Sequence, residues 1–143
     1  MLRAVLDTNV YVAALISRDG SPARIVRALH DGVFDAVVCP TLLAELTGVL
    51  ARPKLSSRIA PDDARAFVAW LERVAIVAAD PVGIEALSPD PGDDYLLALA
   101  RASGAQAVVS GDAHLLGLER ALGHAEYRVL APAVFADLVD SLR

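Results

Sequence analysis

Residues 1–16, MLRAVLDTNVYVAALI, place a short apolar strand directly before a helix. The run Leu2–Leu6 has the length of a buried strand and ends at Asp7, and the apolar residues after it follow helical spacing. If strands and helices continue to alternate, such a stretch opens a parallel sheet. We therefore expect an α/β domain with a carboxylate where its first strand ends.

The same alternation continues to the end of the sequence. Further strands are expected at Phe34–Cys39, Ile76–Ala78, Ala105–Ser110 and Tyr127–Leu130. Helices are expected from Ser21 (as N-cap) to Asp31, from Pro40 to about Ala51, from Pro61 onward, and over Tyr95–Ala102, His114–Leu122 and Pro132–Leu142, with Ser88–Asp94 as a loop. The pattern predicts a single α/β domain, 1–143, with a mainly parallel sheet of about five strands covered on both faces.

The composition points to an intracellular globular protein. Its 143 residues suit one core, and no apolar run approaches the roughly 20 residues that span a bilayer. The sequence enters its first strand without a secretory h-region, and a lone Cys39 suits a reducing compartment. We expect a cytoplasmic protein that does not enter membranes. Its 55% hydrophobic content indicates a partner surface, for a second copy or another protein.

Carboxylates gather at one predicted edge of the sheet. Ligands of open α/β sheets bind outside the carboxyl ends of the strands. Asp7 follows the first strand directly, and Asp112 lies two residues beyond the strand that ends at Ser110. Glu45 comes one turn into the helix after the second strand, and Asp94 stands where the helix before the Asp112 strand begins. We expect these four acids to share one crevice.

Each acid also has a plain structural interpretation. Asp7 and Asp112 could cap helices, Asp93 and Asp94 could cap or interact with a helix dipole, and Glu45 could be a solvated surface residue. Two carboxylates about 5 Å apart repel by about 3 kcal/mol at an effective dielectric near 20. A cluster therefore needs protons or a cation, and oxygen-only ligands suit Mg²⁺ or Mn²⁺. Zinc is not expected, because the single cysteine and the three histidines have no ligand spacing.

Four segments resemble the acidic motifs of PIN-domain proteins. They are LDTNV at 6–10, the helix around Glu45, GDDYLLALA at 92–100 and VSGDAHLL at 109–116. The likeness is closest to the VapC-type toxins of bacterial toxin–antitoxin pairs. It implies a three-layer α/β/α sandwich, a Mg²⁺ or Mn²⁺ centre and endonucleolytic hydrolysis of RNA. It also implies an antitoxin protein as partner and a homodimer.

The resemblance assigns roles to particular residues. Metal ligands or their close supports would be Asp7, Glu45, Asp94 and Asp112, and Asp94 is preferred to Asp93 because it directly precedes Tyr95-Leu96-Leu97. Small polar residues that orient such carboxylates would be Thr8, Asn9 and Ser110. Many relatives carry a further Asp where this chain has His114, which leaves open a second metal or a different role for the histidine. Water activated by the metal would cut the bond, leaving a 5′-phosphate and a 3′-hydroxyl.

Charge neither supports nor excludes RNA as a substrate. Thirteen basic against 18 acidic residues give a net charge of −5, whereas nucleic-acid-binding domains are usually basic. Setting the four candidate carboxylates aside leaves 13 basic and 14 acidic residues. Arg52, Lys54 and Arg58 form a basic segment after the Glu45 helix that could hold an RNA backbone, or could simply be solvated.

Two other functions compete with the nuclease. Phosphoryl transfer through an aspartyl phosphate on Asp7 usually needs a lysine at a later strand end, and the only lysine, Lys54, falls after a helix. The second is a catalytically inactive PIN-like module that binds RNA or protein. Such a module is expected to lose acids, whereas this chain keeps all four.

Overall fold

The computed structural model describes residues 1–84, 91–112 and 127–143, with the backbone alone for 91–93. Its sheet has five strands in the order β3-β2-β1-β4-β5, and every neighbouring pair is parallel. The strands are β1 (Arg3–Leu6), β2 (Asp35–Val38), β3 (Ile76–Val77), β4 (Ala107–Val109) and β5 (Arg128–Leu130). The predicted parallel sheet of about five strands is confirmed.

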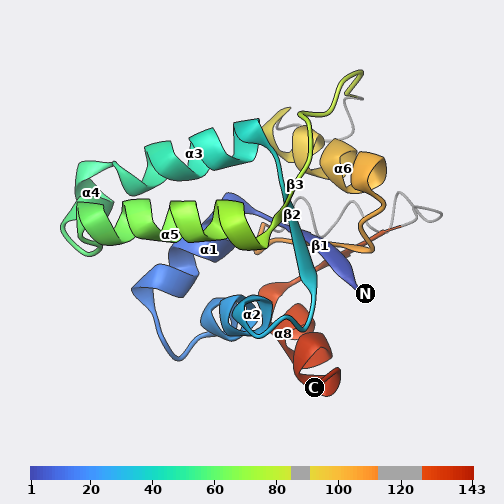
Figure 1. The fold of residues 1–143 in the computed structure, drawn as a ribbon, viewed down its shortest axis with the longest axis horizontal. Helices are drawn as coiled ribbons and strands as arrows, with labels where there is room; N and C mark the ends of the chain where they lie inside the picture. The colour runs from blue at the N-terminus through green and yellow to red at the C-terminus, as the bar shows by residue number, and fades with distance from the viewer. Residues whose placement is uncertain (85–90, 113–126) are drawn as a thin grey trace.

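Helices cover both faces of this sheet. They are α1 (Thr8–Ile16), α2 (Ser21–His30), α3 (Pro40–Leu50), α4 (Pro53–Ser56), α5 (Pro61–Val74), α6 (Pro91–Ser103) and α8 (Pro132–Ser141). Helix α6 packs on β1 and β4, whereas α1 packs on α2 and α3, α3 on α5, and α2 on α8. Figure 1 shows α6 on the opposite side of the sheet from α1, α2 and α5. The molecule is an α/β/α sandwich.

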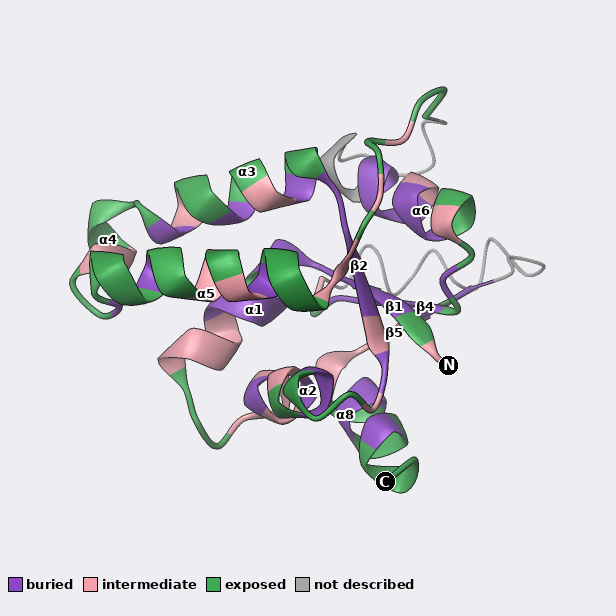
Figure 2. Ribbon diagram, viewed as in Figure 1, coloured by how far each residue is buried: buried purple, intermediate pink, exposed green. Residues whose placement is uncertain are grey.

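The central strands β1 and β2 are buried after their first residues, Arg3 and Asp35. Ala4, Val5 and Leu6 of β1 are fully buried, as are β2 from Ala36 to Val38 and nearly all of β4 (Figure 2). Strands that are covered on both faces need apolar side chains at every position rather than at alternate ones. This explains why the strands are visible in the sequence as continuous apolar runs.

Helix starts differ from the prediction at two places. Helix α6 begins at Pro91 rather than Tyr95, so the expected loop was wrong over its last four residues. Proline is favoured in a first helical turn, because its missing N–H has no partner there anyway. Helix α2 is capped by Gly20, with Ser21 already inside the helix.

Other departures are smaller. The short helix α4, which begins at Pro53, was not among the expected helices. The helix expected over His114–Leu122 lies outside the residues that the structure describes.

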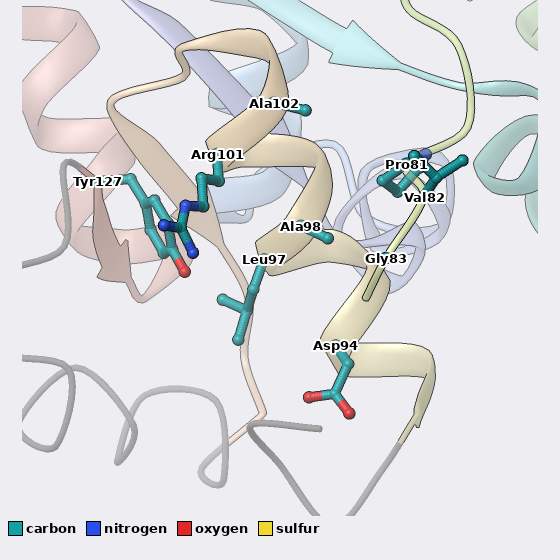
Figure 3. A pocket seen from close by; sticks show the side chains of 9 residues that line it. All are labelled: Pro81, Val82, Gly83, Asp94, Leu97, Ala98, Arg101, Ala102 and Tyr127. Atoms are coloured by element: carbon teal, nitrogen blue, oxygen red, sulfur yellow. The ribbon is translucent and has the colours of Figure 1, made fainter. Parts of the chain in front are cut away.

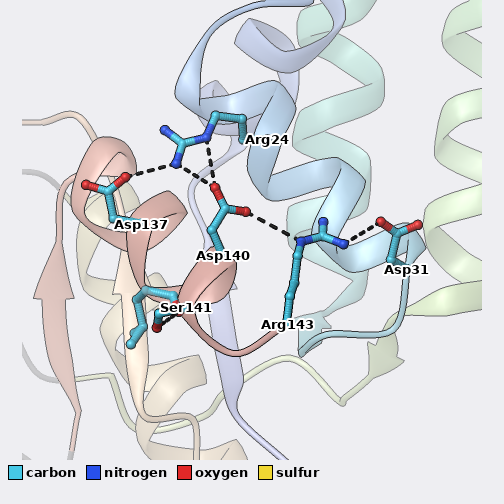
Figure 4. Close-up of polar contacts among 7 residues, drawn as sticks. Arg24, Asp31, Asp137, Asp140, Ser141 and Arg143 are labelled. Atoms are coloured by element: carbon cyan, nitrogen blue, oxygen red, sulfur yellow. Dashed lines mark hydrogen bonds and ion pairs between the residues drawn. The ribbon is translucent and has the colours of Figure 1, made fainter.

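Ion pairs and aromatic rings join α2 and its flanks to α8. Arg24 binds Asp137 at 2.9 Å and Asp140 at 2.6 Å, and Arg143 binds Asp31 at 2.8 Å (Figure 4). The hydrogen bonds to Asp137 and Asp140 raise the pKa of Arg24, and Arg143 lowers the pKa of Asp31. Because these groups are exposed, such pairs contribute little to stability. The apolar contacts beneath them matter more.

No helix in the described ranges is both long enough and apolar enough to span a membrane.

Phe135 is expected to be a main anchor of α8. Its ring is fully buried and meets Phe34 edge-to-face, with centroids 5.1 Å apart. Phe135→Ala leaves a cavity, so the free energy of unfolding should fall by about 3–5 kcal/mol, measured by urea denaturation. The neighbouring Val134 is 54% exposed, and Val134→Ala should change it by less than about 0.5 kcal/mol. Equal losses in the two variants would contradict this assignment.

Candidate active site

The sheet reverses its direction of growth between β1 and β4. From β1 the chain proceeds to β2 and β3 on one side, and it then returns to add β4 and β5 on the other. In open α/β sheets, ligands bind at such a point of reversal, outside the carboxyl ends of the two strands. Asp7 follows β1 at this point, and Ser110 and Asp112 follow β4.

A buried serine joins the two strand ends. The Ser110 hydroxyl donates to Asp7 Oδ2 at 2.8 Å, and Ser110 Oγ accepts from the Asp112 backbone N–H at 3.0 Å. The Asp7 backbone N–H donates to the Val109 carbonyl at 2.9 Å. Asp7 and Asp112 are thus held on either side of one fully buried hydroxyl.

Asp7 caps helix α1 and is also held by Ser110. Its Oδ1 accepts from the Asn9 backbone N–H at 3.3 Å, which makes it the N-cap of α1. Its Oδ2 is the oxygen held by Ser110. Each carboxylate oxygen has two acceptor sites, so both oxygens keep one for a further partner. Asn9 contributes its backbone here, and its side chain is exposed.

A second hydrogen bond crosses from α6 to α3 at the same edge. The Tyr95 hydroxyl donates to Glu45 Oε2 at 3.1 Å, although the two helices lie on opposite faces of the sheet (Figure 1). Burial raises the pKa of Tyr95 strongly, and the negative charge of Glu45 and its acceptance of the hydrogen bond raise it further. The neutral phenol is therefore the stable form, and it fixes one oxygen of Glu45.

Thr8 lies beside both of these links. Its side chain is 2% exposed, and Oγ1 has no hydrogen-bond partner in the part of the chain that the structure describes. Thr8 acts on the pKa of Tyr95, in the lowering direction, but the geometry between the two hydroxyls falls short of a hydrogen bond. A buried hydroxyl without a partner costs about 1–3 kcal/mol. Thr8 therefore offers a polar atom to a ligand or water at this edge.

Asp94 lies in the first turn of α6 and is 5% exposed. It lines a cavity of about 300 Å³ together with residues of α6, the segment after β3 and Tyr127 (Figure 3). The side chains of Asp93 and His114 fall outside the described residues.

Buried polar side chains concentrate at this edge. Within the described ranges, the buried polar or charged residues are Asp7, Thr8, Asp94 and Ser110. Carboxylates are rarely buried unless they are paired or functional. All four residues belong to the predicted site, and none to the structural core elsewhere. The fold thus buries these polar side chains at the edge of the sheet where the sequence predicts a functional site.

The side chains do not form a compact metal cage. No group of three or more His, Cys, Asp or Glu residues within the described ranges lies close enough to hold a metal ion. The donor chemistry nevertheless fits a hard divalent cation, because the candidate ligands are carboxylate oxygens and the neighbouring Thr8 hydroxyl lacks a partner. Two links connect the four predicted carboxylates in pairs. Ser110 bonds both the Asp7 side chain and the Asp112 backbone. Tyr95, the residue after Asp94 in the sequence, donates a hydrogen bond to Glu45.

Two further residues at this edge have structural explanations. Asp80, beyond β3, accepts from the Thr41 backbone N–H at 2.9 Å at the start of α3, and this bond lowers the pKa of Asp80. Burial raises the pKa of the Cys39 thiol to about 11, so it carries little thiolate at neutral pH.

The predicted basic segment lies away from the α6 side of the site. Arg52, Lys54 and Arg58 are exposed around α4, which follows the end of α3 that is remote from α6 (Figure 1). Their proposed contact with RNA stays a prediction. Arg101, which the sequence analysis did not single out, lines the cavity beside Asp94. The available clue was its spacing, seven residues after Asp94 and thus on the same face of α6.

Comparison with known families agrees with this geometry. The family model described as PIN domain matches residues 3–114. That range contains Asp7, Glu45, Asp94 and Asp112 and leaves β5 and α8 outside. No curated protein matched the chain.

Ser110→Ala tests the link between the strand ends. The variant removes the donor to Asp7 Oδ2 and the acceptor of the Asp112 N–H. Water replaces this donor poorly because Asp7 is only 9% exposed. The free energy of unfolding should therefore fall by about 1–3 kcal/mol in urea denaturation.

The matched control is Ser103→Ala. Among the described residues, the Ser103 hydroxyl bonds only to the Ala100 carbonyl of its own helix, at 3.4 Å, and its loss should cost less than about 0.5 kcal/mol. If Ser110→Ala were no more destabilising than this control, the hydroxyl would not be the link that the geometry indicates.

Proposed function

The chain belongs to the PIN-domain family, whose members are typically metal-dependent nucleases, and from this premise we propose that it is a metal-dependent endoribonuclease. The observation that carries the proposal is the gathering of buried polar residues, Asp7, Thr8, Asp94 and Ser110, where the sheet reverses direction. A structural core has no use for two buried carboxylates at one edge.

The candidate ligands of the metal are Asp7, Asp94 and Asp112, with Glu45 as a ligand or close support. Hard oxygen donors favour Mg²⁺ or Mn²⁺ over zinc. When bound, such an ion would activate water and offset the charge that develops on phosphate oxygens. The proposed products are a 5′-phosphate and a 3′-hydroxyl.

The remaining residues position these groups. Ser110 holds Asp7 Oδ2 while the Asn9 backbone holds Oδ1, so the Asp7 carboxylate cannot rotate freely. Tyr95 restrains Glu45 in the same way. Partial burial of Asp7 and Asp94 lowers the local dielectric, which strengthens their attraction for a cation.

We further propose that the chain is the toxin of a cytoplasmic toxin–antitoxin pair and that it forms a homodimer. The four motifs support the first part through their resemblance to VapC-type toxins. Exposed apolar side chains on α8 and at its C-cap support a partner surface, since Val134, Leu138 and Leu142 are 54%, 38% and 53% exposed and recur every fourth residue. Residues at that spacing share one helix face.

The alternative is a PIN-like module that binds RNA or protein without cutting. It gains support from the absence of a compact metal cage among the residues described. Calorimetric titration with Mn²⁺ separates the two, because a pure binding module has no need for a divalent ion.

Asp7→Asn should abolish cleavage. The purified protein and this variant are incubated with mixed RNA under Mg²⁺, Mn²⁺ or EDTA, and 5′-phosphate ends are counted. Replacing the carboxylate by an amide removes one negative charge from the candidate metal centre. Loss of a residue that merely supports a metal ligand lowers activity by about 10–100-fold, so loss of a ligand itself should lower the cleavage rate by at least about 100-fold. Asp19→Asn, an exposed change between α1 and α2, should cleave normally. If the unaltered protein leaves RNA intact with every metal and binds no Mn²⁺, the result would favour the PIN-like module that binds without cutting.

Tyr95→Phe should weaken metal binding without unfolding the protein. It deletes only the hydroxyl that restrains Glu45, and loss of such a support lowers metal affinity by about 10–100-fold. Titration with Mn²⁺ measures this. If Tyr95 acts through Glu45, the change should add little in a Glu45→Gln background.

Tyr11→Phe is the matched control for Tyr95→Phe. Tyr11 is fully buried, but its hydroxyl has no partner in the part of the chain described, so its loss should leave Mn²⁺ affinity unchanged. Fully additive effects of Tyr95→Phe and Glu45→Gln would show that the tyrosine does not act through the glutamate.

A further inference from the structure

The cavity beside Asp94 has walls from three parts of the chain. Pro81, Val82 and Gly83, which follow β3, form one wall, and a face of α6 forms another, with Tyr127 at its far end (Figure 3). Its volume is about 300 Å³, at the lower limit of the roughly 300–1,000 Å³ of small-molecule sites. It can therefore take one nucleoside-sized group and is too small for a base pair.

The α6 wall is apolar between two charged ends. Leu97, Ala98 and Ala102 line its middle, and the two alanines leave the room that larger side chains would fill. Asp94 stands at one end and Arg101 at the other, as Figure 3 shows. Seven helical residues separate them by about 10 Å along the axis. A short stretch of single strand covers this distance, since stacked nucleotides rise about 3.4 Å each.

The charge of Arg101 is available to an anion. Its side chain is exposed, and no carboxylate of the described residues forms an ion pair with it, in contrast to Arg24 and Arg143. A guanidinium can grip a phosphate with two hydrogen bonds. Beside it lies the Tyr127 ring, which is 8% exposed and faces the same cavity.

We propose that this cavity binds one unpaired nucleotide of the RNA substrate, with its base against the apolar α6 wall and an adjoining backbone phosphate on Arg101. The inference rests on the proposed function, because Asp94 belongs to both the cavity and the candidate metal centre. A base inside a duplex is stacked between its neighbours, and it enters a concave site only when it is splayed out of the helix.

Binding without cleavage tests this site directly. Fluorescence anisotropy in EDTA compares a labelled single-stranded RNA oligonucleotide of mixed sequence with the same oligonucleotide in a duplex. The single strand should bind more tightly. Ala98→Phe fills the cavity and should weaken single-strand binding by roughly 5- to 150-fold, the range that the loss of one base contact gives. Arg101→Gln should make the slope of log affinity against log salt shallower by about 0.7.

Matched controls use exposed positions of α5 on the other face of the sheet. Ala66→Phe and Arg73→Gln should keep the single-strand affinity and the salt slope of the unaltered protein. Equal affinity for duplex and single strand, or an unchanged affinity in Ala98→Phe, overturns the proposed nucleotide site. In either case, RNA cleavage by the unaltered protein would still support the nuclease. If the unaltered protein neither binds nor cuts RNA, both proposals fall.

Discussion

The hydrogen bond from Ser110 to Asp7, 2.8 Å long and fully enclosed, is the contact on which the candidate site depends. It exists because β1 and β4 run parallel with Leu6 opposite Val109, so that the next residues of both strands emerge side by side. A shift of one residue in that register would turn Ser110 toward the opposite face. The apolar strands thus do more than fill the core, because their register sets the relative position of Asp7 and Asp112.

Asp7 and Thr8 join two sets of contacts that originate far apart in the sequence. Through Ser110, Asp7 connects to the end of β4, and next to it Thr8 borders the link from Tyr95 on α6 to Glu45 on α3. These helices approach from opposite faces of the sheet, and the hydrogen bond between Tyr95 and Glu45 joins them at its carboxyl edge. The unsatisfied Thr8 hydroxyl lies at this junction. Stability alone does not favour an orphaned hydroxyl in such a place, whereas a site that takes up an ion or a phosphate has a use for it.

Much of the fold was predictable because buried parallel strands need continuous apolar runs, and functional polar residues follow them at their carboxyl ends. The same logic brought Asp7 and Asp112 together, whereas Ser110 was assigned to the site only through the family resemblance. The start of α6 was missed because proline and glycine at 91–92 are as typical of a loop as of a first helical turn. Tyr95 was used only to align a motif, since its partner lies 50 residues away and no local pattern encodes such a contact. Arg101 needed the bounds of α6 before its place on the cavity face could be recognised.

The backbone fixes where the candidate carboxylates begin, while their side-chain rotations decide how closely the oxygens meet. Asp7 and Glu45 are restrained by hydrogen bonds from Ser110 and Tyr95, yet the described acids do not close into a group of three. Carboxylates of like charge repel, and the repulsion grows as water is excluded. A divalent cation between the carboxylates attracts each of them, and this attraction outweighs their mutual repulsion. The four carboxylates that repel one another as bare anions would therefore move closer together around an ion. If a divalent cation binds here, its binding and the final geometry of the site are therefore coupled, and the hydrogen-bonded supports limit how far each carboxylate has to move.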